Sequence, residues 1–453
     1  MPDHTGPLDV LFRAQRAVID GVERPAYVGV VDGRIAVVAP TNADLSAETV
    51  IDLGEDEVLI PGLVDTHVHV NEPGRTEWEG FASATRAAAA GGVTTIIDMP
   101  LNSIPPTTTL AGLQAKQAVA RDQVFVDVGF WGGAVPGNVP DLAPLHDAGV
   151  FGFKCFLLHS GVDEFPHLEP AELELAMTET ARLDALMIVH AEDRQTIEDA
   201  TPAAGTAYAG FLASRPCAAE NLAVARVVEV ARSTGSRAHI LHLSSAEALP
   251  VIREARADGV PLSVETCPHY LTFTAEEVPD GATEFKCCPP IRESGNREEL
   301  WGALADGTID IVVTDHSPCT IDLKTRETGD FGQAWGGVAG LQVGLAAVWS
   351  GARERGHDLP DVIRWMAQGP ADQMGLPTKG RIAVGADADF AVFAPDDTFV
   401  VDATKLHHKN AVTAYAGRTL SGVVRQTWLR GARIDLDPGA QPLGHLLRRG
   451  STS

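Results

Sequence analysis

Cysteine and long apolar runs are both scarce in this chain of 453 residues. None of its six cysteines forms a C-x-x-C pair, which makes a structural zinc knuckle an unlikely feature. Six cysteines in so long a chain also do not fit the disulfide framework of a small secreted protein. No run reaches the length of about 18 apolar residues that a membrane span needs, and residues 1–11 lack the apolar stretch of a secretory signal. We therefore expect a cytoplasmic protein in a reducing compartment.

Positive charge is also in short supply. The chain has 35 Lys and Arg against 61 Asp and Glu, a net charge of −26. Binding to nucleic acid or to an anionic membrane needs clustered Lys and Arg, so neither partner is expected. Apolar residues make up 45% and charged residues 21%, which is typical of a folded protein. The acidic balance therefore indicates solubility rather than a binding surface.

The two ends of the chain are rich in strand-forming residues and in glycine turns. Near the start these strands are expected over 27–31, 34–38 and 49–53, and near the end over 388–394 and 423–429. Two similar ends around a different middle predict one small β-sandwich domain, formed by residues 1–58 together with 380–453.

The middle, 59–379, alternates short apolar runs with longer Ala-rich amphipathic segments. Eight such runs are expected to be strands: 59–64, 93–99, 124–130, 152–157, 186–190, 239–243, 261–266 and 310–314. Helices are expected over 81–90, 170–184 and 219–233, among others. Eight strands, each followed by a helix, predict an α/β protein with a (β/α)8 barrel rather than an open sheet.

Two histidines stand one residue apart at the end of the first run, in the sequence Asp65-Thr66-His67-Val68-His69. In a strand, residues i and i+2 project from the same side, so both rings can reach one metal ion. The pattern alone is equally compatible with two histidines that simply end a strand.

The fourth run contains a lysine, Lys154, between apolar neighbours. Burying an ammonium group is costly, so the lysine needs a reason to be there. One reason would be a carboxylate that pairs with it. The other would be a neutral amine, its pKa lowered by desolvation, that captures carbon dioxide as a carbamate able to bridge two metals.

Three further polar residues stand at the ends of other runs: His190, His242 and Asp315. The carboxyl ends of the strands form the face on which barrel active sites are built. Four His, one Lys and one Asp from five strand ends therefore predict a metal site, and these ligand types suit zinc.

The segments around these residues resemble the amidohydrolase superfamily, and within it the cyclic amidohydrolases. They are 62–69, 153–156 and 314–319, and the resemblance extends from about residue 27 to 435. It implies two divalent metal ions per subunit, a carboxylated Lys154 that needs carbon dioxide or bicarbonate, and a homotetramer.

Other segments are similar to the allantoinase group of that branch. They are 152–157, 160–166, 315–319, 334–337, 340–342, and the tail segments 408–410 and 415–418. The tail departs at Ala414, where the group often has proline. The resemblance implies hydrolysis of the hydantoin ring of allantoin to allantoate, a step of purine degradation, with a small cyclic ureide as the substrate.

Three alternatives remain beside this function. Dihydroorotases usually carry an arginine two residues after the second histidine of the pair, whereas this chain has Asn71, which cannot neutralise a substrate carboxylate. Hydantoinases and dihydropyrimidinases open neutral rings and are the stronger alternative. A non-catalytic scaffold would lack some metal ligands, and none is missing here.

The expected mechanism follows from the types of residue. His67, His69, Asp315 and the Lys154 carbamate would hold one metal, while the carbamate, His190 and His242 would hold the other. Two metals that share a water lower its pKa far below that of bulk water, so a hydroxide is expected to attack a ring carbonyl. Asp315 would accept its proton and deliver it to the departing ring nitrogen.

Contacts with the substrate are expected from Asn71, which follows the first strand, and from backbone groups near Cys287 and Ser317. Loop structure or helix capping would explain each of these three residues equally well.

Overall fold

Parallel strands in the middle of the chain form two arcs. The computed structural model describes residues 6–437 and 439–450; residues 1–5, 438 and 451–453, which include parts of the segment 1–11 and of the predicted small domain, lie outside it. One arc has the order β6-β7-β8 and the other β14-β13-β12-β11-β10-β9. These strands are β6 Leu63–Val68, β7 Val93–Asp98, β8 Asp127–Phe130, β9 Gly132–Gly133, β10 Phe153–Phe156, β11 Leu186–His190, β12 Arg237–Ile240, β13 Leu262–Thr266 and β14 Ile311–Val312.

The two arcs meet at both of their ends. Only Trp131 separates β8 from β9 along the chain. On the other side, Val68 in β6 forms a parallel bridge with His316, shortly after β14. Nearly every residue of these strands is buried, as expected of parallel strands that are covered on both faces.

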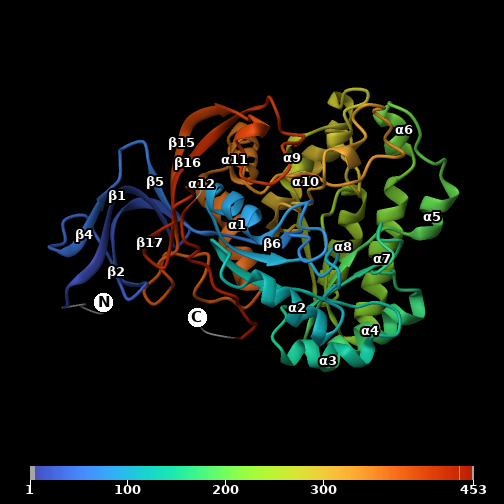
Figure 1. Ribbon diagram of the computed structural model, residues 1–453, viewed down its shortest axis with the longest axis horizontal. Coiled ribbons are helices and arrows are strands. Elements are labelled where there is room, and N and C mark those ends of the chain that lie inside the picture. Colours follow the sequence, from blue (N-terminus) through green and yellow to red (C-terminus); the bar gives the residue numbers. More distant parts are fainter. Residues whose placement is uncertain (1–5, 438, 451–453) are drawn as a thin grey trace.

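Helices follow the strands and cover the arcs on the outside (Figure 1). Two of them show how the sequence sets their bounds. Helix α4 begins at Pro170 behind a capping box formed by Glu169 and Glu172, and α7 ends at Gly235, which adopts a left-handed φ of 71°. The helices are α1 Phe81–Ala90, α2 Leu110–Ala120, α3 Val139–Asp147, α4 Pro170–Arg182, α5 Arg194–Asp199, α6 Tyr208–Ala213, α7 Cys217–Thr234, α8 Leu249–Ala257, α9 Pro268–Thr272, α10 Ser294–Ala305, α11 Gly344–Glu354, α12 Leu359–Ile363 and α13 Gly369–Gln373.

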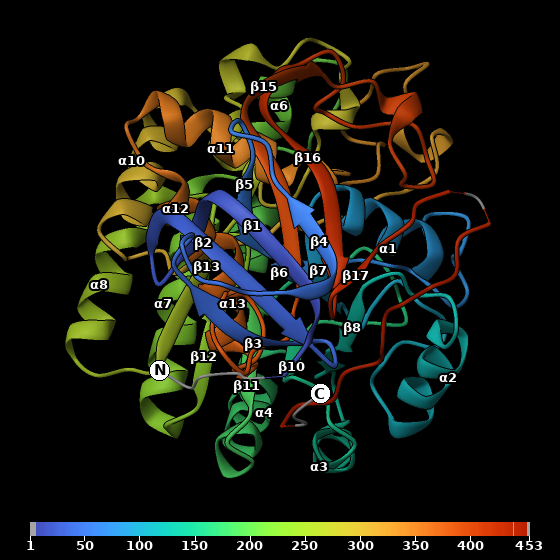
Figure 2. The ribbon, with the colours of Figure 1, turned by 90° about the vertical axis from the view of Figure 1, so that its left-hand side faces the viewer.

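Strands from both ends of the chain share a third sheet, which lies against one side of the arcs (Figures 1 and 2). Its main order is β17-β16-β15-β5-β1-β2-β3, and β4 pairs with β1. The sheet has its own hydrophobic cluster, in which Phe12 packs edge-on against Phe390 and Trp428. The strands are β1 Leu8–Ile19, β2 Val22–Val31, β3 Arg34–Ala39, β4 Ala47–Asp52, β5 Val58–Pro61, β15 Phe390–Val400, β16 Thr419–Leu429 and β17 Ala432–Arg433.

The expectation of one barrel strand over 59–64 is wrong. Strand β5 ends at Pro61 and pairs with β1 and β15 in the third sheet, and β6 begins only at Leu63. Gly62 separates them, and a Cβ atom at this position would collide with the side chain of Thr94. The chain therefore changes from one sheet to the other at a residue where only glycine fits.

Two strands end two or three residues earlier than expected. Strand β12 ends at Ile240 and β14 at Val312, so that His242 and Asp315 lie just beyond their strands. Both residues have a positive φ, 35° and 43°, a backbone conformation that non-glycine residues rarely adopt and that often occurs at functional sites.

In the part of the chain that the structure describes, we find no helix that could span a membrane.

A buried ion cluster joins the third sheet to the arcs. Lys379 Nζ lies 2.6 Å from Asp127 at the start of β8, 3.0 Å from Asp387 and 2.7 Å from Asp389 just before β15. Burial alone would lower the pKa of Lys379, but Asp389, Asp127 and Asp387 raise it above its ordinary value. The lysine therefore stays charged, and it holds carboxylates from both sheets.

Replacing Lys379 with methionine should lower the free energy of unfolding by about 3–5 kcal/mol, because buried carboxylates lose their counter-charge. Denaturant unfolding followed by tryptophan fluorescence measures this change. Arg232→Met, which removes an exposed pair with Asp258, is the matched control and should cost less than about 1 kcal/mol. Equal losses in the two variants would contradict the anchoring role of Lys379.

Candidate metal centre

The six predicted metal ligands gather at the carboxyl ends of the strands. Each is at most 6% exposed, and all except His67 line one cavity of about 670 Å³. His67 is fully buried beneath it. The residues are His67 in β6 and His69 after it, Lys154 in β10, His190 at the end of β11, His242 after β12 and Asp315 after β14.

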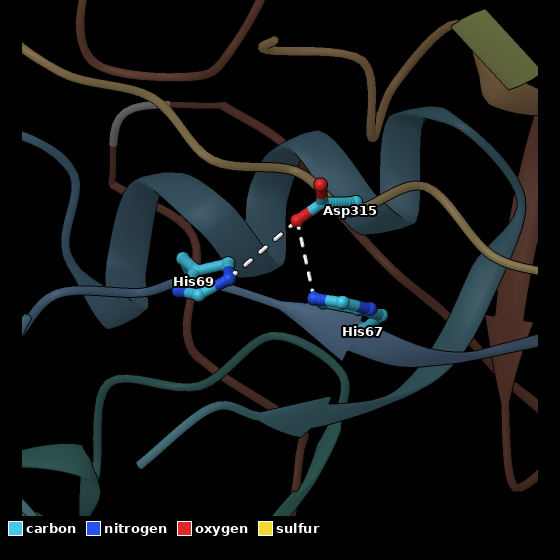
Figure 3. Close-up of side chains that lie close together, drawn as sticks. All are labelled: His67, His69 and Asp315. Atoms are coloured by element: carbon cyan, nitrogen blue, oxygen red, sulfur yellow. Dashed lines mark ion pairs between the residues drawn. The ribbon is translucent and has the colours of Figure 1, made fainter. Parts of the chain in front are cut away.

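Three of these residues form a compact group around the Asp315 carboxylate (Figure 3). His67 Nε2 lies 3.1 Å from Asp315 Oδ1, and His69 Nε2 lies 3.5 Å from the same oxygen. One ligand atom from each residue lies within 4.8 Å of the others, so the three could hold a metal ion. His67 Nε2 nevertheless lacks the geometry of a hydrogen bond to the carboxylate. The atoms thus converge on a common point rather than satisfying one another.

The protonation states of this group suit a cation. Burial lowers the pKa of His69 to about 3, so its ring is neutral and has a free lone pair. Burial would raise the pKa of Asp315, but His67 and His69 beside it hold that pKa well below the usual value. Burial would lower the pKa of His67, but Asp315 and Glu265 beside it raise that pKa above its ordinary value. One ionised carboxylate therefore stands between the neutral ring of His69 and the ring of His67, whose protonated form the carboxylates favour.

Lys154 lies in the wall of the same cavity and is 1% exposed. Within the described part of the chain it forms no ion pair, and its Nζ lies 5.0 Å from the centre of the Phe156 ring. Burial lowers the pKa of Lys154 to about 8, although Asp315 and Glu265 act in the opposite direction. The alternative of an ion-paired lysine thus has no carboxylate to supply the pair.

The rings of His190 and His242 pack edge to face, with centres 4.6 Å apart. His190 Nε2 lies 2.7 Å from Glu192 Oε2, which leaves Nδ1 as the nitrogen available to a ligand. Burial lowers the pKa of His242 well below its usual value and also lowers that of His190. Both rings can therefore act as neutral donors.

The three predicted substrate contacts are placed differently. Cys287 and Ser317 line the cavity, and the Ser317 hydroxyl donates to the Asp315 carbonyl at 2.8 Å. Asn71 is fully buried, is not among the cavity's lining residues, and donates from Nδ2 to the Pro318 carbonyl at 3.3 Å. The contact of Asn71 is thus with the segment that follows Asp315.

Buried ionic residues behind the ligands did not emerge from the sequence. Glu265 contacts His67 at 2.5 Å, and Glu192 pairs with Arg215 at 2.6 Å. Glu220 accepts from the backbone of Ser244 and Ser245, just after His242, and pairs with Arg292.

Glu265 could have been found by the signal that identified Lys154, because it too is a charged residue inside a predicted strand.

The comparisons with known proteins agree over nearly the whole chain. The amidohydrolase family model matches residues 58–434. The allantoinase of Streptomyces avermitilis is 59% identical over 444 residues, which cover 98% of this chain and 99% of that protein. The allantoinase of Saccharomyces cerevisiae is 44% identical over 453 residues, 96% of this chain and 97% of that protein.

The chain belongs to the allantoinases of the amidohydrolase family. Solved structures share its fold. An L-hydantoinase (dihydropyrimidinase) from Arthrobacter aurescens has a TM-score of 0.91 at 29% identity and covers 98% of this chain and 100% of its own. A D-hydantoinase has a TM-score of 0.87 at 26% identity, with 97% and 98% covered. The predictions of a cyclic amidohydrolase and of a hydrolase that acts on cyclic amides are confirmed. The solved structures support the predicted α/β fold of the barrel type.

Asn71→Asp should destabilise the segment after Asp315, because an acceptor would then face the Pro318 carbonyl. We expect a loss of about 1–3 kcal/mol in the free energy of unfolding and a lower kcat/KM. Asn71→Gly is the control, since it keeps the left-handed φ of 66° and removes the side chain without placing a second acceptor against the carbonyl. Denaturant unfolding and steady-state kinetics would measure both effects, and a glycine variant as impaired as the aspartate variant would argue against this role.

Proposed function

We propose that the cavity binds allantoin and that the protein opens its hydantoin ring by hydrolysis, with two divalent metal ions, to give allantoate. The observation that carries the proposal is that five of the six candidate ligands line one cavity and the sixth, His67, is buried next to Asp315, in a chain that matches allantoinases nearly end to end.

The donor set fits two metals. His67, His69, Asp315 and a carbamate on Lys154 would hold the first, and the same carbamate with His190 and His242 would hold the second. Neutral imidazoles and carboxylate oxygens suit zinc, which we propose as the usual metal. Bound there, the ions would lower the pKa of a water molecule to near 7 and polarise the ring carbonyl.

The chain's own residues would move the proton. Asp315 Oδ1 faces the space shared with His67 and His69, where the attacking water would lie. Its carboxylate would accept a proton from that water and then deliver it to the ring nitrogen as the carbon–nitrogen bond breaks. A carboxylate held ionised until this moment is suited to the first of these two steps.

The cavity suits a neutral ring better than a carboxylate such as dihydroorotate. Its lining cations besides Lys154, namely Arg215 and Lys286, are already engaged within the described part of the chain. Arg215 pairs with Glu192 at 2.6 Å, and Lys286 Nζ donates to the Ala334 carbonyl at 2.5 Å. A substrate carboxylate would therefore find no unpaired arginine among the residues that line the cavity. Hydantoinase or dihydropyrimidinase activity is the second candidate, because the solved structures named above share the fold.

We further propose that the two arcs close as a (β/α)8 barrel and that the third sheet is a separate small β-sandwich domain. The contacts at both ends of the arcs support the barrel, and the separate hydrophobic cluster supports the domain. The pairing of β5 favours Gly62, rather than residue 58, as the boundary, with the second boundary near residue 380. Homotetrameric assembly, cytoplasmic location and a role in purine degradation complete the proposal.

Protein loaded with zinc and bicarbonate should hold about two metals per chain and should turn over allantoin faster than hydantoin, dihydrouracil or dihydroorotate. A chelator should abolish the activity, and added metal should restore it. Elemental content and a substrate panel with purified protein measure these outcomes. Faster turnover of dihydrouracil or hydantoin would favour the second candidate, and absence of bound metal would refute the two-metal centre.

Lys154→Ala should be nearly inactive and should regain activity with acetate or propionate at fixed ionic strength, because a short carboxylate can occupy the place of the carbamate. Lys154→Arg is the matched control: its side chain fills that space and its guanidinium stays protonated, so no rescue is expected. Electron density or the intact mass of metal-loaded protein tests the carbamate directly. An unmodified Lys154 amine in fully active protein would refute it.

A further inference from the structure

A buried carboxylate on β13 contacts candidate ligands of both metals, although β13 supplies none of the six ligands. Glu265 is 1% exposed. Its Oε1 lies 2.5 Å from His67 Nδ1 and accepts from the backbone N–H of His242 at 3.1 Å. One side chain thus reaches the ring of a first-metal ligand and the backbone of a second-metal ligand.

The other oxygen of Glu265 is held by a second buried histidine. His239 Nε2 lies 2.9 Å from Glu265 Oε2. On its far side, His239 Nδ1 is 2.8 Å from Ser263 Oγ and 2.8 Å from Gln373 Nε2. A carboxylate only accepts, so His239 Nε2 carries a hydrogen and donates it to Glu265. Nδ1 is then the nitrogen that faces Ser263 and Gln373.

These bonds leave one tautomer for the neutral ring of His67. A carboxylate only accepts, so His67 Nδ1 must carry a hydrogen and donate it. The free lone pair is then on Nε2, the nitrogen that lies 3.1 Å from Asp315 Oδ1. A metal needs that lone pair, so His67 can bind only through Nε2.

We propose that Glu265, supported by His239, is a positioning residue of the metal centre: it fixes the tautomer of His67 and holds the strained backbone of His242. The proposal rests on the two-metal centre proposed above. Glu192 offers a matched comparison, because among the candidate ligands it contacts His190 only. Disturbing Glu265 should therefore affect both metals, whereas disturbing Glu192 should affect one.

The first experiment measures metal affinity in Glu265→Gln and Glu192→Gln. A glutamine at position 265 carries an NH2 group in place of one acceptor oxygen. That group would face one of the N–H donors that converge on Glu265, so His67 or His239 must change its tautomer or lose its hydrogen bond. Competition between metal-free protein and a chelator for zinc, followed by native mass spectrometry, counts and ranks the bound ions. We expect affinity for both ions to fall in Glu265→Gln, by roughly 10- to 100-fold for the first, and for only one ion in Glu192→Gln. Wild-type affinities in Glu265→Gln would overturn the proposal.

A second experiment separates positioning from a merely structural role. Histidine-selective ¹⁵N NMR of metal-free protein, at a pH where His67 is neutral, should show a hydrogen on Nδ1 in the wild type and a mixed population in Glu265→Gln. An Nε2–H tautomer of His67 in the wild type would refute the proposal. This readout needs no metal, so it remains valid even if the two-metal centre fails.

His239 supplies variants that avoid a change at Glu265 itself. His239→Gln can still donate to Glu265 and should keep metal affinity near the wild-type value, whereas His239→Leu cannot and should lower it. The free energy of unfolding of the metal-free proteins is measured alongside. Equal metal affinities in the two variants, or losses that follow stability alone, would contradict positioning.

Discussion

Desolvation at the carboxyl ends of the strands is the constraint on which the site depends. It lowers the pKa of Lys154 to about 8 and that of His69 to about 3, so His69 is neutral and Lys154 loses its proton far more readily than an exposed lysine. Asp315 is the exception, because the rings around it keep it ionised. Burial also leaves His67 Nε2, His69 Nδ1 and His242 Nδ1 without hydrogen bonds in the described structure, at about 1–3 kcal/mol each. A bound cation would relieve part of that cost, so metal binding would stabilise the folded chain.

Buried ion pairs behind the site hold the strand ends in place against this cost. Asp98 accepts from the backbone of Val70, just after His69, and pairs with Lys116 at 2.6 Å. Glu220 likewise accepts from the backbone of Ser244, two residues after His242, and pairs with Arg292. Each carboxylate fixes a backbone amide next to a ligand and is itself neutralised by a cation. The candidate ligands are thus positioned by residues that do not line the cavity.

The sequence predicts what is local and misses what is paired over a distance. Apolar runs interrupted by a polar residue identify most of the parallel strands and all six candidate ligands. The same pattern contains Glu265, but its meaning depends on His67, 198 residues away, and no local signal names that partner. The division of 59–64 at Gly62 depends on pairing with β15 near the other end of the chain. The positive φ of His242 likewise follows from tertiary contacts rather than from residue type.

A hydrogen-bonded line of residues runs beneath the candidate metal ligands. It runs from Gln373, which lines a cavity of about 520 Å³ at the amino ends of the strands, through His239 and Glu265 to His67. These residues lie in or below the strands and hold the ligands from beneath. The cavity above them is lined largely by loops, which can change without moving the ligands. The arcs thus set the positions of the candidate metal ligands, whereas the loops supply most of the other residues that line the cavity.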